Sequence, residues 1–259
     1  MTKRIDISCD MGESFGLWKM GRDEEMVDYI TSANVACGFH ASDPRHMYDT
    51  VQACKAKGVR VGAHVGFPDL MGFGRRPMQL TPEQTRDYLI YQTGALKLFL
   101  ELAGESLQHV KPHGSLYMMA AEDEQMSRII LETVASIGRD LPVYCMRQSA
   151  TYEVGKRMGV PVVVEFYPDR GMRDNGQIIF TFDLNNIGGN AVAMAERAVR
   201  CVLEGKVRSN ETGVDVDLMP DSVCLHGDTP FAIEFAKAIR AAFAAADIEA
   251  APLAAAFSG

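Results

Sequence analysis

The sequence predicts an α/β protein, a seven-stranded β/α barrel that forms a single domain over residues 1–259. Three observations lead to this prediction. Seven short apolar segments mostly alternate with helical patterns, which is typical of a parallel sheet with right-handed crossovers. Each segment ends on polar residues, and the carboxyl ends of barrel strands are where active sites form. The chain contains neither G-x-G-x-x-G nor G-x-x-x-x-G-K-[ST], which disfavours an open nucleotide-binding sheet.

Composition and charge narrow the class of protein. Hydrophobic residues make up 47% of the 259 residues and charged residues 23%, as in ordinary globular proteins. A net charge of -8 and a pI near 5.3 disfavour a nucleic-acid partner, which requires a basic face. A local basic site for a small anion remains open.

Nothing in the sequence indicates secretion or a membrane. Lys3 and Arg4 precede only a short apolar run that reaches Asp6, so we expect no secretory signal. Asp247 and Glu249 interrupt the alanine-rich tail, and no apolar stretch is long enough to cross a bilayer. We therefore expect a cytoplasmic protein that does not bind membranes.

The first strand runs to Asp10, and a glycine-hinged loop carrying Glu13 follows it. A short helix over residues 23–30 precedes a strand over residues 35–39, which delivers His40. Both strands thus end on groups that can take part in catalysis.

A strand, helix, strand unit follows. Asp43 and Pro44 have the chemistry of a helix start and Gly58 that of a helix end. The next strand, over residues 59–63, delivers His64.

The loop over residues 65–80 is rich in glycine and carries Asp69, Arg75 and Arg76. Loops of this length in compact domains are usually functional or mobile. The two arginines could equally be solvated loop charges.

Thr81 and Gln84 have the spacing of a capping box and start a long amphipathic helix. A very short strand then begins at Val110 and ends on Lys111 and His113.

The middle of the chain continues the alternation. The predicted elements are helices over residues 123–138 and 149–158 and strands over residues 141–146 and 160–164. The last of these strands is the most β-branched run in the chain and ends at Glu165, with Asp169 and Arg170 just beyond.

An apolar piece over residues 177–182 interrupts the pattern, and we place it as an arm or hairpin outside the main sheet. A helix over residues 191–204 and a loop-like stretch over residues 207–220 follow.

The seventh strand, over residues 222–225, delivers His226 and Asp228. The last long helix starts at Thr229, and Asp228 could simply cap it.

The gathering of titratable groups at strand ends is the main functional observation. Four of the six histidines lie there, namely His40, His64, His113 and His226. One such histidine could be an ordinary core residue, but burying several ionisable groups at one rim is costly unless function retains them. Carboxylates and imidazoles together suit acid and base catalysis on a carbonyl or amide. Asp10 with His40 and His64 could equally hold a divalent metal, and both interpretations stay open.

Six ordered segments carry a resemblance to a known family. They are DMGESFG, SANVACGFHASDP, GAHVGFPDLMGFGRR, YQTGALK, HVKPHGSLY and CLHGDTP. They resemble the signature blocks of the LamB/YcsF family, to which the A subunit of prokaryotic 5-oxoprolinase belongs, from residue 5 to about residue 248. The resemblance implies a seven-stranded barrel of the glycoside hydrolase/deacetylase type.

The resemblance also implies an activity, which is the ATP-dependent opening of 5-oxo-L-proline to L-glutamate together with partner subunits B and C. ATP would be a co-substrate of the complex, because this chain has no phosphate loop. A divalent metal remains open, as does a homo-oligomer.

Matching the motifs residue by residue gives the expected site. The expected catalytic residues are Asp10, Glu13, His40, His64, His113 and Asp169. The expected substrate-binding residues are Asn34, Asp69, Arg75, Arg76, Lys111, Glu165, Arg170, His226 and Asp228. Asp10 or Glu13 would act as base toward water, and His64 or His113 would protonate the ring nitrogen. Lys111, Arg75 and Arg76 would hold a carboxylate or phosphate.

One segment departs from the family pattern. Residues 177–189 read QIIFTFDLNNIGG, where the family usually has an arginine-containing tract. This difference leaves room for another lactam or amide as substrate.

The rival hypotheses are a metal-dependent deacetylase of an N-acetylated sugar and a non-catalytic subunit that binds a small acid.

Overall fold

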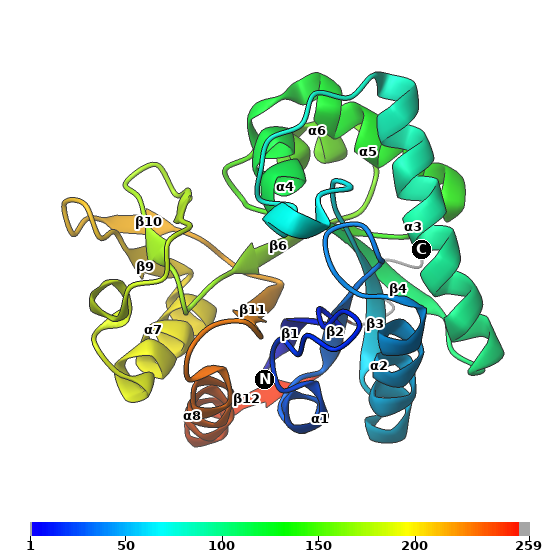
Figure 1. The fold of residues 1–259 in the computed structure, drawn as a ribbon. Coiled ribbons are helices and arrows are strands. Elements are labelled where there is room, and N and C mark those ends of the chain that lie inside the picture. Colours follow the sequence, from blue (N-terminus) through cyan, green and yellow to red (C-terminus); the bar gives the residue numbers. More distant parts are fainter. Residues whose placement is uncertain (1, 254–259) are drawn as a thin grey trace.

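The structure is a computed structural model that describes residues 2–253. Its centre is a closed ring of seven parallel strands, with helices around it (Figure 1). In ring order they are β1 (Lys3–Met11), β2 (Ser32–Ala36), β3 (Arg60–Val65), β4 (Leu107–Pro112), β5 (Val143–Cys145), β6 (Val162–Phe166) and β11 (Ser222–His226). Pairing of β11 with β1 closes the ring. The predicted seven-stranded β/α barrel is confirmed.

The helices surround the ring. They are α1 (Asp23–Met26), α2 (Pro44–Lys57), α3 (Pro82–Leu102), α4 (Gly114–Glu122), α5 (Glu124–Ile137), α6 (Ala150–Met158), α7 (Ala191–Glu204) and α8 (Ala232–Ala245). Figure 1 shows α3 to α6 packed together on one side, whereas α7 lies across the molecule near α8.

Capping chemistry sets the helix ends where the sequence predicted them. The Asp43 side chain accepts hydrogen bonds from the backbone N–H groups of Arg45 and His46, and α2 ends at Gly58 with a φ of 67°. Glycine adopts this left-handed conformation without the steric cost that a Cβ would add. Thr81 and Gln84 form both hydrogen bonds of the predicted capping box.

Several predicted boundaries were wrong. The strand predicted over residues 35–39 ends at Ala36, so His40 lies in the following loop. The fourth strand begins at Leu107 rather than Val110, and it is six residues long. Helix α4 was not predicted, and α8 begins at Ala232 instead of Thr229.

The predicted hairpin outside the sheet is confirmed, because β7 (Gly171–Met172) pairs antiparallel with β8 (Ile178–Ile179). The stretch predicted as loop-like contains a second hairpin of β9 (Lys206–Arg208) and β10 (Asp215–Asp217). The unpredicted β12 (Ile248–Ala250) pairs with the start of β1. Two short 3-10 helices, η1 (Leu70–Gly72) and η2 (Leu184–Ile187), complete the elements.

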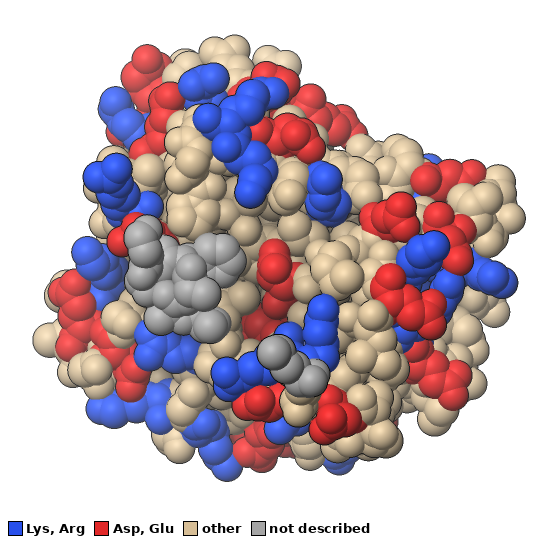
Figure 2. Space-filling model, turned by 180° about the vertical axis from the view of Figure 1, so that it is seen from behind, with Lys and Arg blue, Asp and Glu red and all other residues tan. Residues whose placement is uncertain are grey.

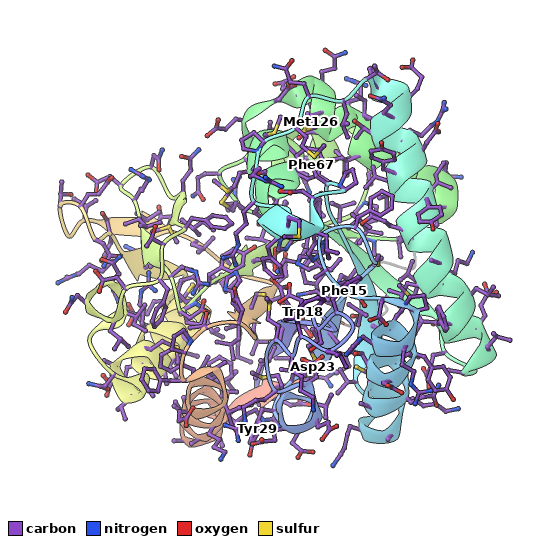
Figure 3. All side chains as sticks on the ribbon, viewed as in Figure 1. Phe15, Trp18, Asp23, Tyr29, Phe67 and Met126 are labelled. Atoms are coloured by element: carbon purple, nitrogen blue, oxygen red, sulfur yellow. The ribbon has the colours of Figure 1, made fainter. Side chains whose placement is uncertain are left out.

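The exterior carries charged side chains of both signs. Figure 2 views the molecule from the side opposite to Figure 1 and shows basic and acidic side chains interspersed over that face. The loop after β1 carries Phe15 and Trp18, whose rings stack with centroids 6.2 Å apart (Figure 3). No helix within residues 2–253 combines the length and apolar character that a membrane span requires.

A cluster of hydroxyl groups surrounds Asp6 of β1 inside the barrel. The Asp6 carboxylate is buried and accepts hydrogen bonds from four hydroxyl groups, those of Thr31, Ser32, Tyr144 and Ser222, at 2.6–3.0 Å. Burial nevertheless raises the pKa of Asp6, although the hydroxyl groups oppose this shift.

Candidate active site

Strand register brings the first catalytic candidates together. Asp10 on β1 lies beside His226 on β11 and beside Asn34 on β2. His64 on β3 lies beside Lys111 on β4. Because parallel strands in register present their ends at one rim, groups distant in sequence meet at the carboxyl end of the barrel.

Lys111 and Asp10 form the buried centre of the site. The Lys111 ammonium lies 2.7 Å from Asp10 Oδ1, 3.3 Å from Glu165 Oε1 and 3.1 Å from the Cys224 sulfur. The side chains of Asp10, Lys111 and Glu165 are almost fully buried. Burial alone would raise the pKa of Asp10, but His64 and Lys111 hold it well below its usual value. Asp10 is therefore a carboxylate at neutral pH and a weak base.

A hydrogen-bonded chain continues from Asp10 into the barrel. Asn34 donates to Asp10 Oδ1 at 2.8 Å, and its own oxygen lies 2.6 Å from His109 Nε2. The His109 ring stacks on Tyr144 with a centroid separation of 4.0 Å. His109 was predicted to precede a strand, but it lies within β4, and a Cβ on Gly62 would collide with its ring. Glycine at position 62 therefore makes room for this imidazole.

His109 gives a testable pH dependence of stability. Burial and the nearby Lys111 charge lower its pKa well below the usual value, so it is neutral in the folded protein. In the unfolded chain His109 binds a proton below about pH 6.5. The free energy of unfolding therefore falls by up to about 1.4 kcal/mol for each pH unit below that value. We expect His109→Gln to flatten the decline of the free energy of unfolding between about pH 6.5 and pH 5, measured by urea denaturation. Parallel profiles for the two proteins would contradict this assignment.

Three histidines and a glutamate form a second cluster above Asp10. His64 Nε2 lies 2.9 Å from His113 Nδ1 and 3.4 Å from Asp10 Oδ2. The His40 ring stacks on His113 with centroids 3.7 Å apart, and His40 Nε2 lies 3.7 Å from Glu13 Oε1. The stack needs a glycine at position 74, because a Cβ there would lie 2.7 Å from His40 and 2.8 Å from His113.

The protonation of this cluster follows from burial. Burial and the neighbouring imidazoles lower the pKa of His40 and His113 well below the usual value. Burial, then Asp10 and Asp228, raise the pKa of Glu13 well above its usual value. Asp10 is therefore ionised at neutral pH, whereas Glu13 nearby has a high affinity for a proton.

The same cluster has the composition of a metal site. One ligand atom from each of Glu13, His40, His64 and His113 lies within 4.8 Å of the others. Both nitrogens of His40 are buried without a hydrogen-bond partner among the described residues. Such orphaned imidazole nitrogens are unfavourable unless a proton donor or a metal ion satisfies them. The predicted ligands His40 and His64 belong to this group, and Asp10 lies beside it.

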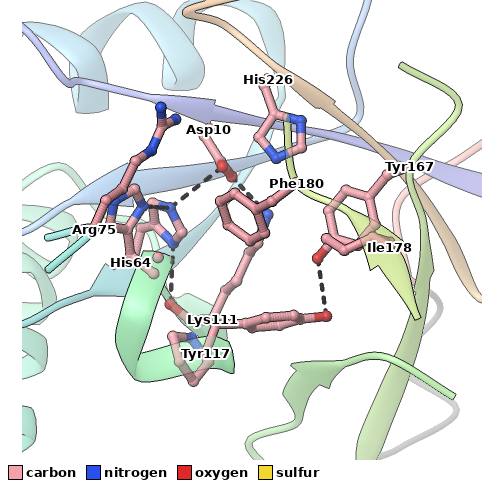
Figure 4. A pocket seen from close by; sticks show the side chains of 12 residues that line it. Asp10, His64, Arg75, Lys111, Tyr117, Tyr167, Ile178, Phe180 and His226 are labelled. Atoms are coloured by element: carbon pink, nitrogen blue, oxygen red, sulfur yellow. Dashed lines mark hydrogen bonds and ion pairs between the residues drawn. The ribbon is translucent and has the colours of Figure 1, made fainter. Parts of the chain in front are cut away.

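Tyrosines line the opposite wall of the pocket, as Figure 4 shows. Tyr167 donates a hydrogen bond to Glu165 at 2.7 Å, and the Tyr117 hydroxyl lies 2.9 Å from the Tyr167 hydroxyl. The Tyr167 ring stacks on His226, whose Nδ1 lies 3.1 Å from Asp169. Burial opposes ionisation of Asp169, but His226 and Arg170 lower its pKa to about 2. Asp169 therefore orients His226 as a stable carboxylate.

Comparison with known proteins shows the family to which the chain belongs. Residues 5–258 match the LamB/YcsF family. The chain belongs to the LamB/YcsF family. It is 44% identical over 246 residues to a Bacillus licheniformis protein that is named as the A subunit of 5-oxoprolinase, covering 95% of this chain and 97% of the relative.

Solved structures show how far the fold extends within and beyond this family. A lactam utilization protein from Thermus thermophilus superposes with a TM-score of 0.90 at 40% identity, covering 96% of this chain and 99% of that protein. A T48 deacetylase with substrate superposes with a TM-score of 0.50 at 13% identity, covering 100% and 92%. The second likeness concerns the fold alone, and it confirms the predicted deacetylase type of barrel.

Most of the residues expected from the family resemblance do meet. The inner pocket or its immediate neighbours include Asp10, Glu13, Asn34, His40, His64, Arg75, Lys111, His113, Glu165, Asp169 and His226. Arg170 and Asp228 line an adjoining outer cavity instead. Asp228 does not cap α8, because the helix has no side-chain cap and Asp228 pairs with Arg75 at 2.7 Å.

Asp69 and Arg76 line neither the inner pocket nor the outer cavity. The Asp69 carboxylate accepts from the Gly72 backbone N–H and pairs with Arg76, whose side chain is 67% exposed. These interactions hold the loop that positions Arg75. Their expected role in substrate binding stays a prediction.

Six residues that line the pocket were not predicted from the sequence: Pro112, Gly114, Tyr117, Tyr167, Ile178 and Phe180. Tyr117 lies on the unpredicted α4. Tyr167 could have been found, because it is two residues beyond Glu165 and alternate residues of a strand share a face.

Proposed function

We propose that this chain is the A subunit of an ATP-hydrolysing 5-oxoprolinase, which opens 5-oxo-L-proline to L-glutamate together with subunits B and C. The name of the 44% identical relative supports the proposal. The observation that carries it is the pocket itself, where Asp10, Lys111 and the histidine cluster meet within hydrogen-bonding distance. We propose further that residues 1–259 act as one domain, in the cytoplasm.

Hydrolysis of a lactam needs a base toward water, a stabiliser of negative charge on the carbonyl oxygen and an acid toward the nitrogen. Glu13 suits the role of base, because it has a raised pKa and no hydrogen bond to the described residues. In the metal-free site Glu13 would take a proton from water as the water oxygen bonds to the carbonyl carbon. The carbon–nitrogen bond would break, and His113 or His64 would pass a proton to the nitrogen from the ring nitrogen that faces the other imidazole. Lys111 would stabilise the oxyanion.

ATP would enter through the partner subunits. This chain has no phosphate loop, so phosphorylation of the lactam would take place on subunits B and C, with release of phosphate after ring opening. Arg75 lines the pocket and is 42% exposed, which suits it to hold the substrate carboxylate.

A divalent metal fits the Glu13, His40, His64 and His113 group. His64 Nδ1 faces the Lys111 carbonyl at 3.1 Å and His113 Nε2 faces the Phe73 carbonyl at 2.8 Å, so these two nitrogens carry protons. The remaining nitrogens then direct lone pairs toward each other at 2.9 Å. When bound, the ion would polarise the carbonyl group.

The metal proposal is tested without turnover. Chelator-treated protein is titrated with Zn²⁺, Mn²⁺ or Mg²⁺ while the melting temperature and metal content are measured. A bound ion should raise the melting temperature, since ligands that prefer the folded state stabilise it. His40→Ala should lose this shift, and an unchanged melting temperature in the wild type would rule out a tight site.

Reconstitution tests the proposed function. The chain with subunits B and C, ATP and 5-oxoproline should form glutamate, and omission of any one component should stop it. His113→Ala should lower turnover by about 10²–10⁴-fold, the usual contribution of an acid or base. Unchanged turnover in this variant would remove His113 from the mechanism.

Two rival functions have distinct outcomes in the same assay. Release of acetate from an N-acetylated sugar by the metal-loaded chain alone would indicate a deacetylase. Calorimetric binding of 5-oxoproline, with partner turnover that does not need this chain, would indicate a binding subunit. The metal-ligand group is the observation that keeps the deacetylase in consideration.

A further inference from the structure

The catalytic pocket is too small for a substrate in this structure. Its volume is about 20 Å³, although Asp10, His64, Lys111, His113 and His226 all line it. Such a volume holds about one water molecule. Besides these catalytic groups, the wall includes the apolar side chains of Ile178 and Phe180.

A larger cavity of about 430 Å³ adjoins the pocket on the outside. Its wall comprises Arg75, Arg170, Phe180, Thr181, Phe182, Asp228, Thr229 and Pro230. Arg75 and Phe180 are the two residues that line both spaces among those described. Phe180 therefore separates the catalytic pocket from a space that is large enough for a small acid.

Phe180 is placed where a side chain can move. It directly follows β8, whose hairpin with β7 has only two paired positions. On the other side of this hairpin, the Met172 backbone N–H donates a hydrogen bond to Asn210 Oδ1 at 2.7 Å. The Asp174 backbone N–H donates one to Glu211 Oε2 at 2.9 Å. In contrast, no hydrogen bond joins the backbone of residues 180–182 to the rest of the described chain.

The packing around Phe180 also differs from that of its neighbour. The Phe182 ring packs near Phe235, with centroids 6.3 Å apart, and near the Arg170 guanidinium at 5.7 Å. Phe180 is half-buried and packs against the pocket wall near Tyr117 and Tyr167. In Figure 4 its ring lies in the middle of the pocket view, between His64 and Tyr167.

We propose that Phe180 is a gate that closes the catalytic pocket and selects substrates by the size of their ring, and that an anionic substrate enters through the outer cavity. This inference rests on the proposed function for the identity of the ring. The gate itself follows from the two cavities and their shared wall.

Arg75 can accompany the substrate through this path. Its guanidinium pairs with Asp228 at 2.7 Å and lies 4.9 Å from the Phe73 ring. Since Arg75 lines both spaces, a carboxylate that replaces Asp228 in the outer cavity keeps the same partner on entry. Arg170 borders the outer cavity with a buried Nε that has no hydrogen-bond partner among the described residues.

The first test of the gate needs no partner subunit. Acylation of His64 and His226 by diethyl pyrocarbonate is followed by mass spectrometry in the wild type and in Phe180→Ala. We expect at least a tenfold faster reaction in the variant. Phe182→Ala is the matched control, because Phe182 is an aromatic residue of the same segment that lines only the outer cavity. Equal rates in the wild type and Phe180→Ala would overturn the gate, as would equal acceleration in both variants.

The second test addresses ring size in the complex with subunits B and C. For Phe180→Ala, kcat/KM for a six-membered lactam acid relative to 5-oxoproline should rise at least about tenfold, as expected for one methylene group in a fitted pocket. Phe180→Leu should give a smaller rise and guards against a fold defect in the alanine variant. An unchanged ratio in both variants overturns selection by ring size.

The two proposals fail in different ways. If the wild-type complex formed no glutamate from 5-oxoproline, the proposed function would be lost. The acylation rates would still decide whether Phe180 closes the pocket.

Discussion

Replacing Lys111 with methionine is expected to lower the free energy of unfolding by about 3–5 kcal/mol, the cost of breaking a buried ion pair on one side. Lys111 is the cation beside both Asp10, at 2.7 Å, and Glu165, at 3.3 Å. Burial alone would lower the pKa of Lys111, but Asp10 and Glu165 raise it well above the usual value. Methionine would keep most of the volume and leave two carboxylates buried without their counter-ion.

Urea denaturation at neutral pH measures this loss. Lys57→Met is the matched control, because the Lys57 ammonium lies 2.6 Å from Asp28 in a pair that is about half exposed. Exposed pairs contribute at most about 1 kcal/mol. The double variant Lys111→Met/Glu165→Gln should recover part of the loss, since it removes one of the two uncompensated charges. A single Lys111→Met variant as stable as Lys57→Met would show that the buried pair does not stabilise the barrel.

The residues that could be predicted from sequence are those with local chemistry. Asp43 and Gly58 bound α2 as predicted, because capping depends on a few neighbouring residues. The strand ends that carry His64, Lys111 and His226 could also be predicted, because the apolar runs before them are short and distinct. Because strands and helices alternate along the chain, these strand ends were predicted to meet at one rim of the barrel.

The failures have equally physical causes. Helix α4 starts at Gly114 directly after His113, which makes no side-chain cap, so the usual start signal is missing. In β9 and β10 only the middle residue, Val207 or Val216, is buried between exposed charged residues, which is too short a pattern to indicate a strand.

The site shows the same limit. Arg75 and Arg76 are adjacent in sequence, but only Arg75 lines the pocket, whereas Arg76 pairs with Asp69. The direction of each side chain depends on the loop conformation, which sequence patterns do not specify. Phe180 offered no chemical signal either, since an apolar side chain in an apolar run predicts packing.

Glu13→Gln is expected to lower turnover of the reconstituted complex by about 10²–10⁴-fold while leaving stability unchanged or higher. Glu13 is buried, it makes no hydrogen bond to the described residues, and its nearest basic group is His40 Nε2 at 3.7 Å. Burial and neighbouring carboxylates raise its pKa, so the ionised form costs stability at neutral pH. A neutral amide of the same shape removes that cost and also removes the base.

Asp6→Asn is the matched control for this prediction. Asp6 is also a buried carboxyl group with a raised pKa, but four hydroxyl groups donate hydrogen bonds to it at the opposite end of the barrel. The amide nitrogen of asparagine cannot accept those hydrogen bonds, so this variant should lose about 1–3 kcal/mol and keep its turnover per folded molecule. Two buried carboxyl groups of one barrel would then respond in opposite ways, because hydrogen bonds compensate the burial of Asp6, whereas Glu13 has no such bonds to the described residues and is proposed to serve catalysis. Loss of stability without loss of turnover in Glu13→Gln would instead assign Glu13 a structural role.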